Sequence, residues 1–276
     1  MAELKFPLKE KCVVMLAPSF VVDFSYPEII SQLKQLGFDN VVELTFGAKM
    51  VNREYHKKLE NSKGLVISSV CPGIVETIKS KFPQYKKNLI LVDSPMIAMA
   101  KVCRKFYPKH KIVFISPCNF KKAEAKNSGI VDYVIDYKQL KEILKSNKII
   151  SRENKNLHFF DKFYNDYTKI YPLAGGLSKT AHLKGVLKKD EIKVIDGILD
   201  VEKFLEKPDK KIKFLDCNFC KGGCIGGPCV NSKDSLKKRK KKVLKYFALA
   251  EKEEIPKFRK GLVAEAKGIS FVKKVF

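Results

Sequence analysis

Tryptophan is absent from this sequence, and no apolar run is long enough to cross the hydrocarbon core of a bilayer. We therefore expect no membrane span. Residues 1–20 combine a lysine-bearing start with a short apolar stretch that Pro18 interrupts. This pattern does not predict a signal peptide, so we expect a cytoplasmic protein. Histidines are few and show no spacing typical of a metal site: His56, His110, His158 and His182.

Negative charge is scarce, because 55 lysine and arginine residues outnumber 30 aspartate and glutamate residues, for a formal net charge of +25. Such a field attracts nucleic acid, anionic membranes or an acidic electron-transfer partner. Most of the positive charge is lysine spread along the chain, so we favour a general lysine bias over a dedicated binding surface. The densest run, Lys237 to Lys242, lies in a helical pattern at 234–254. We expect it to form a charged surface helix rather than a nucleic-acid-binding stripe.

Apolar, β-rich runs alternate with amphipathic stretches along most of the chain. The stretches at 25–37, which Gly37 is expected to end, and 96–108 have helical spacing. Residues 146–170 are polar and weakly periodic, and predict either a connection between lobes or an exposed extension. Strands that are apolar throughout indicate parallel sheets covered on both faces, so the fold class is α/β, in one or two sheets. The predicted strands are 11–16, 40–44, 64–69, 88–92, 111–116, 131–135, 192–196 and 212–216.

Four of the eight cysteines lie in turns rich in proline or glycine, each after a short apolar run. Cys71 lies in ISSVCPGIV, Cys118 in ISPCNFKKAE, and Cys220 and Cys224 in FCKGGCIGGPC. A strand that ends in such a turn can direct a thiolate at a shared point, and four thiolates are what a [4Fe–4S] cluster needs. A zinc site with four cysteines is the weaker alternative, because the paired C-x-x-C motifs of a zinc ribbon are missing.

The other four cysteines are interpreted differently. Cys12 and Cys103 lie in apolar surroundings and are expected to be ordinary buried residues. Cys217 and Cys229 flank the glycine-rich loop and are ambiguous, with a role as spare thiols near the cluster left open. Metal ligation or catalysis is favoured over disulfides in a cytosolic chain of this size.

Two of the cysteine turns carry further signals of a site. Cys118 precedes a predicted helix whose N-terminus would favour its thiolate, and Lys121 lies one turn on, on the same side. Glu124 follows one turn later, and by itself the spacing of Lys121 and Glu124 predicts only a solvated pair. Pro72, directly after Cys71, is typical of the first position of a helix.

Together the three cysteine segments resemble the cluster loops of iron-only, or [FeFe], hydrogenases, in the catalytic domain of their large subunit. The family motifs are T-S-C-C-P-x-W, M-P-C-x-x-K-x-x-E and E-x-M-A-C-x-G-G-C, and the matching segments are 68–72, 117–124 and 216–224. The stretches MLAPSF, LGFDNVVELTFGAKM, DSPMIAMA and YPLAGGLSKTAHL are also similar to the family. The resemblance covers nearly the whole chain in the right order, and is greatest to the sensory or regulatory hydrogenase-like members.

The resemblance implies a single domain over residues 1–276, without a separate ferredoxin domain. Its fold would be two α/β lobes, each with a mainly parallel sheet flanked by helices, and a cluster in the cleft between them. The implied ligands of a [4Fe–4S] cluster are Cys71, Cys118, Cys220 and Cys224, and Cys224 would also bridge to a diiron subcluster if one is assembled. The implied cofactor contacts are Ala17, Pro18, Ser69, Val70, Lys121 and Asn218, with Lys121 and Glu124 as candidate contacts of the diiron unit.

Several positions depart from the family pattern. The family's first loop has a proton-relaying cysteine where this chain has Val70, which carries no ionisable proton. The tryptophan position is Ile74 and the methionine position is Asn218, while Glu54 keeps one carboxylate in a basic segment. No C-x-x-C-x-x-C segment precedes the domain as an electron wire.

We therefore predict an iron–sulfur protein used for redox sensing or electron transfer, with little hydrogen turnover. Its partner would be a redox protein such as a ferredoxin, or a signalling protein. The first alternative is a slow hydrogenase with a diiron unit, which needs another proton donor, for which Cys217 or a water chain is a candidate. The second is a basic nucleic-acid-binding module in which the cysteines are structural.

Overall fold

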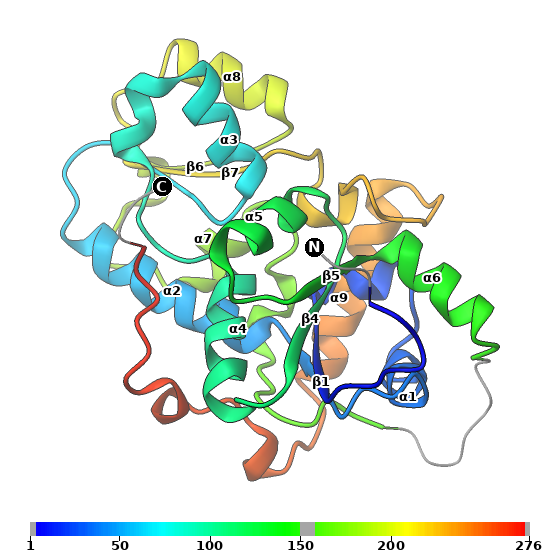
Figure 1. Ribbon diagram of the computed structural model, residues 1–276. Helices are drawn as coiled ribbons and strands as arrows, with labels where there is room; N and C mark the ends of the chain where they lie inside the picture. The colour runs from blue at the N-terminus through cyan, green and yellow to red at the C-terminus, as the bar shows by residue number, and fades with distance from the viewer. Residues whose placement is uncertain (1–3, 150–157, 274–276) are drawn as a thin grey trace.

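Two parallel β-sheets organise the protein (Figure 1). The computed structural model describes residues 4–149 and 158–273, and its sheets have the strand orders β2-β1-β4-β5 and β3-β7-β6. All the strand pairs described are parallel. The prediction of an α/β fold with a mainly parallel sheet in each of two lobes is confirmed. The strands are β1 (Cys12–Leu16), β2 (Asn40–Glu43), β3 (Val66–Ile67), β4 (Lys111–Ser116), β5 (Tyr133–Asp136), β6 (Ile192–Asp196) and β7 (Phe214–Asn218).

Helices form most of the connections between the strands, and among those described none is long and apolar enough to cross a membrane. The α-helices are α1 (Glu28–Gln35), α2 (Thr45–Glu60), α3 (Pro72–Lys81), α4 (Pro95–Phe106), α5 (Phe120–Ser128), α6 (Tyr137–Ser146), α7 (Gly176–Thr180), α8 (Ile198–Glu206) and α9 (Leu236–Ala250). The short 3-10 helices are η1 (Pro18–Val22), η2 (Pro83–Asn88), η3 (Tyr167–Ile170), η4 (Lys189–Glu191), η5 (Gly223–Gly226), η6 (Lys257–Arg259) and η7 (Val263–Ala266).

The first sheet is covered on both faces, as its apolar strands predict. Along β1, alternate side chains point to opposite faces of the sheet. Val13 and Met15 pack in a core with α2 and α4, whereas Val14 packs on the other face with α1, α6 and α9. Cys12 in β1 and Cys103 in α4 are fully buried, which confirms the expectation for both.

The second sheet is covered on its outer face by α3 and α8, which Figure 1 shows side by side above β6 and β7. Its other face meets the first lobe. There Phe214 of β7 packs against Tyr55 of α2, with ring centroids 5.9 Å apart. Helix α2 therefore contacts both the core of the first sheet and the inner face of the second, and joins the two lobes.

Local sequence signals explain several helix ends. Ser94 accepts a hydrogen bond from the backbone of Ile97 at the start of α4, and Pro95 occupies its first turn. Helix α1 ends at Gln35, and Gly37 follows with φ of 97°, a left-handed conformation that glycine adopts without strain. Pro72 opens α3, as predicted.

The strand predicted at 88–92 is wrong. That region holds the end of η2 and only single bridges, Ile67 with Leu89 and Val92 with Val272. The neighbouring prediction at 64–69 shortens to the two residues of β3, because the Asn88 amide donates a hydrogen bond of 2.7 Å to the carbonyl of Leu65. At this edge of β3, a side-chain hydrogen bond thus takes the place of further backbone hydrogen bonds between strands. Of the predicted connection at 146–170, residues 150–157 lie outside the described part.

Candidate metal centre

The carboxyl ends of strands from both sheets lead to the same cleft. In the first sheet, β1 is followed along the chain by β2 on one side, and β4 by β5 on the other. The space between β1 and β4 is therefore a topological switch point, where parallel sheets bind ligands. Ala17 and Pro18 directly follow β1, and Cys118 follows β4. In the second sheet, Cys71 follows β3 and Cys220 follows β7.

A cavity of about 100 Å³ lies where these turns meet. Most of the residues predicted for the site line it: Ala17, Pro18, Val70, Cys71, Cys118, Lys121, Asn218 and Cys224. The predicted residues that do not line it are Ser69, Glu124 and Cys220. We call this cavity and its lining residues the cleft.

The four cysteine thiols lie close enough to act on one another electrostatically. Burial raises the pKa of Cys118, and charge on Cys71 raises it further. Burial raises the pKa of Cys220 to about 12, to which Cys118 and Cys71 also contribute. Burial likewise raises the pKa of Cys224, and charge on each of the other three adds to the effect. Every pair of these cysteines thus interacts, although they come from three distant segments.

The raised pKa values of Cys118, Cys220 and Cys224 mean that these three thiols disfavour negative charge unless a positive centre accompanies it. A bound metal supplies that charge, displaces the thiol protons and holds the thiolates together. Among residues 4–149 and 158–273, no three His, Cys, Asp or Glu side chains are grouped around a position for one metal ion. In a [4Fe–4S] cluster the four cysteines surround a body larger than one ion. The four thiols therefore form a group of donors from three segments that lie near one another.

Glycine allows the loop between β7 and η5 to fold tightly. Gly222 and Gly223 have φ of 82° and 72°, values that other residues rarely adopt. The amide of Gly223 donates to the carbonyl of Cys220 at 3.0 Å, and the amide of Cys224 donates to Pro172 at 2.8 Å. A Cβ at Gly223 would lie 2.6 Å from the Pro172 carbonyl oxygen. The close turn brings the second cysteine of the loop into the wall of the cleft.

The end of the same loop docks on the Cys118 turn. The amide of Cys229 donates to the carbonyl of Pro117 at 3.1 Å, and its thiol donates to the side-chain oxygen of Asn119 at 3.0 Å. A Cβ at Gly227 would overlap the Pro117 carbonyl. The ambiguous Cys229 thus lies beside the cysteine group and holds two of its turns together.

Lys121 enters the cleft from the first turn of α5. Backbone amides at the start of α5 donate hydrogen bonds to the Cys118 thiol, which lower its pKa against the effect of burial, as the helix N-terminus predicts. The Lys121 ammonium lies 2.6 Å from the Glu124 carboxylate and 3.4 Å from the carbonyl oxygen of Val70. The two charged side chains are only 14% and 12% exposed. The expectation of a solvated pair is therefore wrong, because the fold shields it.

Strand alternation decides which side chains of β7 reach the cleft. Asp216 and Asn218 line it, whereas Cys217 between them packs into the core under α3 and α8. The Cys217 thiol is fully buried and lies 3.7 Å from the hydroxyl of Ser68. The hypothesis that Cys217 supplies a proton to the cleft is therefore contradicted. Val70, which is apolar, lines the cleft.

The polar residues Ser19, Tyr171 and Asp216 line the cleft and were not predicted as site residues. Asp216 is 2% exposed and accepts a hydrogen bond of 2.9 Å from the amide of Ser178, while burial raises the pKa of its carboxyl. A carboxylate at the end of an apolar strand was the signal that could have identified it. The hydroxyl of Tyr171 is buried and has no hydrogen-bond partner among the described residues. Tyr171 begins the stretch YPLAGGLSKTAHL, whose resemblance to the family was the signal that could have identified it.

Ser69 and Glu54, which were singled out in the sequence, both lie outside the lining of the cleft. The hydroxyl of Ser69 donates to the carbonyl of Ile90 at 2.7 Å, and its amide donates to the Tyr55 hydroxyl at 2.8 Å. Ser69 thus ties the first cysteine turn to α2. Glu54 lies 3.3 Å from the Lys57 ammonium and does not line the cleft.

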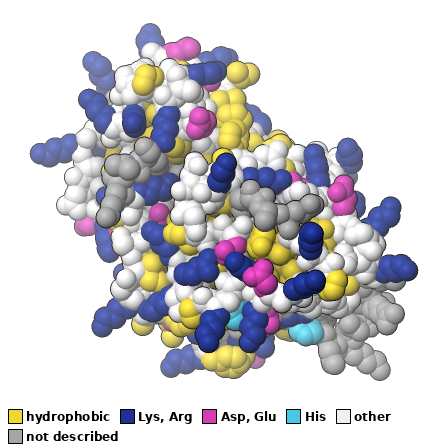
Figure 2. Space-filling model, viewed as in Figure 1, with side chains coloured by type: hydrophobic (Ala, Val, Ile, Leu, Met, Phe, Trp, Pro, Cys, Tyr) yellow, Lys and Arg dark blue, Asp and Glu magenta, His cyan; other side chains and the backbone are white. Residues whose placement is uncertain are grey.

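The basic run in α9 forms the predicted helix, but part of it turns inward. The guanidinium of Arg239 donates to the carbonyls of Ile225, Ser232 and Asp234 at 2.9, 2.6 and 2.9 Å. Lys242 forms an ion pair of 2.8 Å with Asp234. On the face shown in Figure 2, lysine and arginine side chains are scattered, with acidic side chains among them. Arg239 therefore fastens the loop that carries Cys224, a role that the charge run did not predict.

Comparisons with known proteins agree with this architecture. The family model described as "Iron only hydrogenase large subunit, C-terminal domain" matches residues 10–228. Iron hydrogenase 1 from Clostridium pasteurianum is 26% identical over 288 residues, which cover 83% of this chain and 50% of that protein. This chain therefore spans about half the length of that curated relative.

Solved structures of [FeFe]-hydrogenases share the fold. HydA(deltaEFG), from work on stepwise H-cluster assembly, has a TM-score of 0.68 and 17% identity, covering 94% of this chain and 89% of that chain. An [FeFe]-hydrogenase from work on oxygen inactivation has a TM-score of 0.73 and 17% identity, covering 96% and 91%. A variant of HydA1 from Chlamydomonas reinhardtii has a TM-score of 0.66 and 15% identity, covering 92% and 86%. Since the family model matches most of the chain, the protein belongs to the family formed by the C-terminal domain of the iron-only hydrogenase large subunit.

Proposed function

We propose that this chain binds a [4Fe–4S] cluster through Cys71, Cys118, Cys220 and Cys224, and serves redox sensing or electron transfer with little hydrogen turnover. The proximity of these four thiols, from three distant segments, is the observation that carries the proposal: Cys71, Cys118 and Cys224 line the cleft, and Cys220 interacts with all three. A cluster bound there supplies a centre that accepts and releases an electron. The relatives' names support an iron-containing cofactor of this type.

The protein's own groups favour anionic ligands in the cleft. The Lys121 ammonium lowers the pKa of both Cys118 and Cys224, so it favours their thiolates. Glu124 holds that ammonium in place and also accepts a hydrogen bond of 3.0 Å from the Ser94 hydroxyl. Because Glu124 does not itself line the cleft, we assign it the role of positioning Lys121.

The residues at the two candidate donor positions, 70 and 217, support little hydrogen turnover. Val70 cannot carry a proton, and Cys217 faces the core instead of the cleft. A positioned acid or base contributes about 10²- to 10⁴-fold to the rate of a proton-transfer step. We therefore expect hydrogen evolution to be slower by about that factor than in relatives that keep the relay cysteine.

The partner we propose is a redox protein such as a ferredoxin, or a signalling protein. The formal net charge of +25 would speed the approach of an acidic partner and would make the encounter sensitive to salt. We retain the cytoplasm as the proposed location.

Iron and acid-labile sulfide per chain, measured in protein purified without oxygen, test the cluster directly. About four of each are expected. Cys71→Ser, Cys118→Ser and Cys220→Ser should each lose the iron and the brown chromophore. Cys103→Ala is the matched control, because Cys103 is a buried cysteine outside the cleft and its loss should leave the iron content unchanged. Zinc in place of iron, or a chromophore that survives all three ligand changes, would refute the proposal.

A second candidate is a slow hydrogenase that also carries a diiron unit. The cavity beside Cys224, lined by Lys121 and Asn218, favours it, since these are the positions that the resemblance assigns to that unit. Co-expression with maturation enzymes should then give about six irons per chain and infrared bands of CO and cyanide. The change Val70→Cys should raise hydrogen evolution. Absence of the infrared bands would eliminate this candidate.

A further inference from the structure

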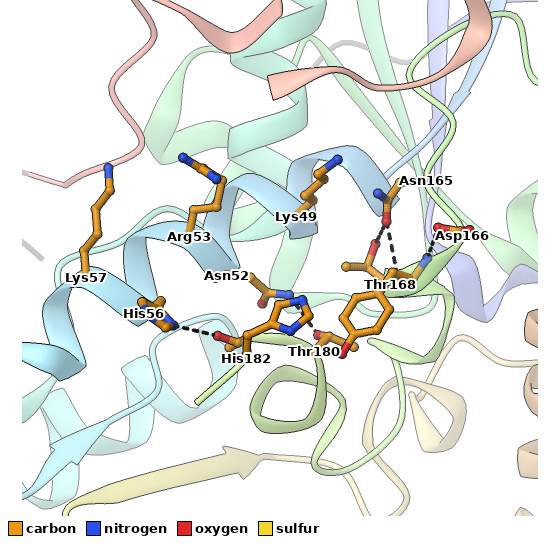
Figure 3. A pocket seen from close by; sticks show the side chains of 12 residues that line it. Lys49, Asn52, Arg53, His56, Lys57, Asn165, Asp166, Thr168, Thr180 and His182 are labelled. Carbon is orange, nitrogen blue, oxygen red and sulfur yellow. Dashed lines mark hydrogen bonds between the residues drawn. The ribbon is translucent and has the colours of Figure 1, made fainter. Parts of the chain in front are cut away.

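A second cavity, of about 490 Å³, lies along α2 (Figure 3). Its walls come from α2, from the segment 165–168 around the start of η3 and from residues 180–182 at the end of α7. No residue that lines it also lines the cleft. Its size falls within the range of about 300–1,000 Å³ that small-molecule sites occupy. We call it the α2 cavity.

Three cationic side chains line the α2 cavity at every fourth position of α2: Lys49, Arg53 and Lys57. Figure 3 shows them in a row along the helix. Four residues of α-helix advance about 6 Å, so neighbouring members of the row lie one helical turn apart. The only carboxylate among the lining residues is Asp166. The α2 cavity therefore carries an excess of positive charge.

The central cation of the row is available to a ligand. Within the described part of the chain, the Arg53 guanidinium has no hydrogen bond or ion pair, and its side chain is exposed. Lys49 makes one long hydrogen bond of 3.3 Å to the carbonyl of Gly261, and Lys57 is 3.3 Å from Glu54. Burial lowers the pKa of Lys49, the charge of Asp166 opposes that shift, and the charge of Arg53 adds to it, so a bound anion would offset the repulsion between the two cations.

Other residues that line the α2 cavity have features typical of a ligand site. His182 is not glycine, yet it has φ of 52°, and its ring stacks on Tyr167 at 4.7 Å between centroids. Left-handed backbone at such a residue persists only where its surroundings hold it, and it often occurs at ligand sites. Asn52 is 5% exposed, and its side-chain oxygen is buried without a hydrogen-bond partner among the described residues. Its amide nitrogen donates to Thr180 at 2.8 Å.

We propose that the α2 cavity binds a small anion that carries a diphosphate group. Two linked phosphates can reach two cations one helical turn apart, and arginine is suited to bidentate contacts with phosphate oxygens. A hydroxyl on the ligand would satisfy the oxygen of Asn52. Free diphosphate and a nucleoside diphosphate share this chemistry, and only the second offers a ring to the exposed side of His182. This site is independent of the cluster in the cleft.

Calorimetric titration of the full chain with inorganic pyrophosphate, and separately with ADP, tests the site. Saturable one-to-one binding is expected, and Arg53→Gln should weaken it about tenfold or more, because a charge-assisted hydrogen bond is lost. Lys241→Gln is the matched control, since Lys241 is an exposed residue of α9 outside the α2 cavity and the change in net charge is the same. Because Arg53 is exposed, its variant should keep the unfolding midpoint of the parent.

The two ligands separate the sources of the diphosphate. Tighter binding of ADP, lost selectively in His182→Gly, assigns the α2 cavity to a nucleotide. Equal affinity for the two ligands assigns it to free diphosphate. No saturable binding of either ligand, or the same affinity in the Arg53→Gln and Lys241→Gln proteins, would overturn the proposal.

Discussion

Replacing Lys169 with methionine should destabilise the fold strongly, because Lys169 forms a fully buried ion pair. Its ammonium lies 2.5 Å from the carboxylate of Glu43, and both side chains are 0% exposed. The same ammonium lies 2.6 Å from the hydroxyl of Tyr246, which donates to the other carboxylate oxygen of Glu43 at 2.9 Å. The three residues connect the end of β2 with η3 and α9, so the pair joins segments that are far apart in the chain.

The magnitude follows from what the substitution leaves behind. Removing one partner of a buried pair costs about 3–5 kcal/mol of the free energy of unfolding, because the other charge stays buried without compensation. Methionine fills much of the space of lysine, so little of this cost comes from a cavity. The ammonium also lies 4.4 Å from the ring centre of Tyr164 and 4.3 Å from that of Tyr246, and these cation–π contacts are lost as well.

The dependence on pH identifies the cause. Burial raises the pKa of Glu43, and the charge of Lys169 opposes that rise. In Lys169→Met the opposition disappears, so the pKa of Glu43 in the folded state rises further above its value in the unfolded chain. A carboxyl shifted in this way favours folding at pH below its unfolded pKa, and this contribution is lost as the pH rises through its folded pKa. The loss of stability should therefore shrink as the pH falls towards the usual range of a glutamate.

Urea unfolding of the metal-free chain at pH 8 and at pH 5.5 measures both effects. The double variant Glu43→Gln with Lys169→Met should recover most of the loss, because no charge remains buried. Lys211→Met is the surface control, since Lys211 pairs with Asp190 at 2.7 Å with both side chains more than half exposed, and it should leave the free energy of unfolding nearly unchanged. An equally small effect of Lys169→Met, or a loss that does not shrink in acid, would refute the reasoning.

Two further changes test how the cysteine loop is held. Gly223→Ala should lower both the stability of the fold and the amount of iron retained. Its φ of 72° disfavours a side chain, and the new Cβ would lie 2.6 Å from the Pro172 carbonyl oxygen. Chelator-resistant iron per chain measures the effect, and unchanged retention of iron would contradict the account. Arg239→Gln should speed the release of iron to a chelator by about tenfold or more, because the hydrogen bond to the Ile225 carbonyl beside Cys224 is lost and such a bond to a charged group contributes about 1.5–3 kcal/mol. The exposed neighbour Lys238→Gln is its control, and equal release rates in the two variants would show that Arg239 does not fasten the loop.

The α/β class was predictable because its signals are local. Apolar runs such as the one at 111–116 predict buried parallel strands, and Pro72 marks the first turn of α3. The failed strand at 88–92 shows the limit of this reasoning. Its residues are apolar enough for a strand, but the side-chain amide of Asn88 donates to the carbonyl of Leu65, next to β3. The hydrophobic periodicity of the sequence does not reveal this contact.

The site was predicted in part for a similar reason. A cysteine in a turn after a strand was visible in the sequence, as was the charge spacing of Lys121 and Glu124. The burial of that pair was not visible, because it depends on the residues that other segments pack around α5. Successive side chains of a strand point to opposite faces, so Cys217 could face either the cleft or the core. The pairing of β7 in its sheet decided that it faces the core.

By itself, the sequence determined the elements and the turns, because hydrophobic period and the conformational freedom of glycine act over a few residues. Only the tertiary structure decided which turns meet. It brought cysteines from three segments to one cleft and enclosed Lys169 with Glu43. It also brought the cations of α2 and His182 to the lining of one cavity. The physical reason is that burial and electrostatic interaction depend on distance in space, which packing sets between segments far apart in the chain.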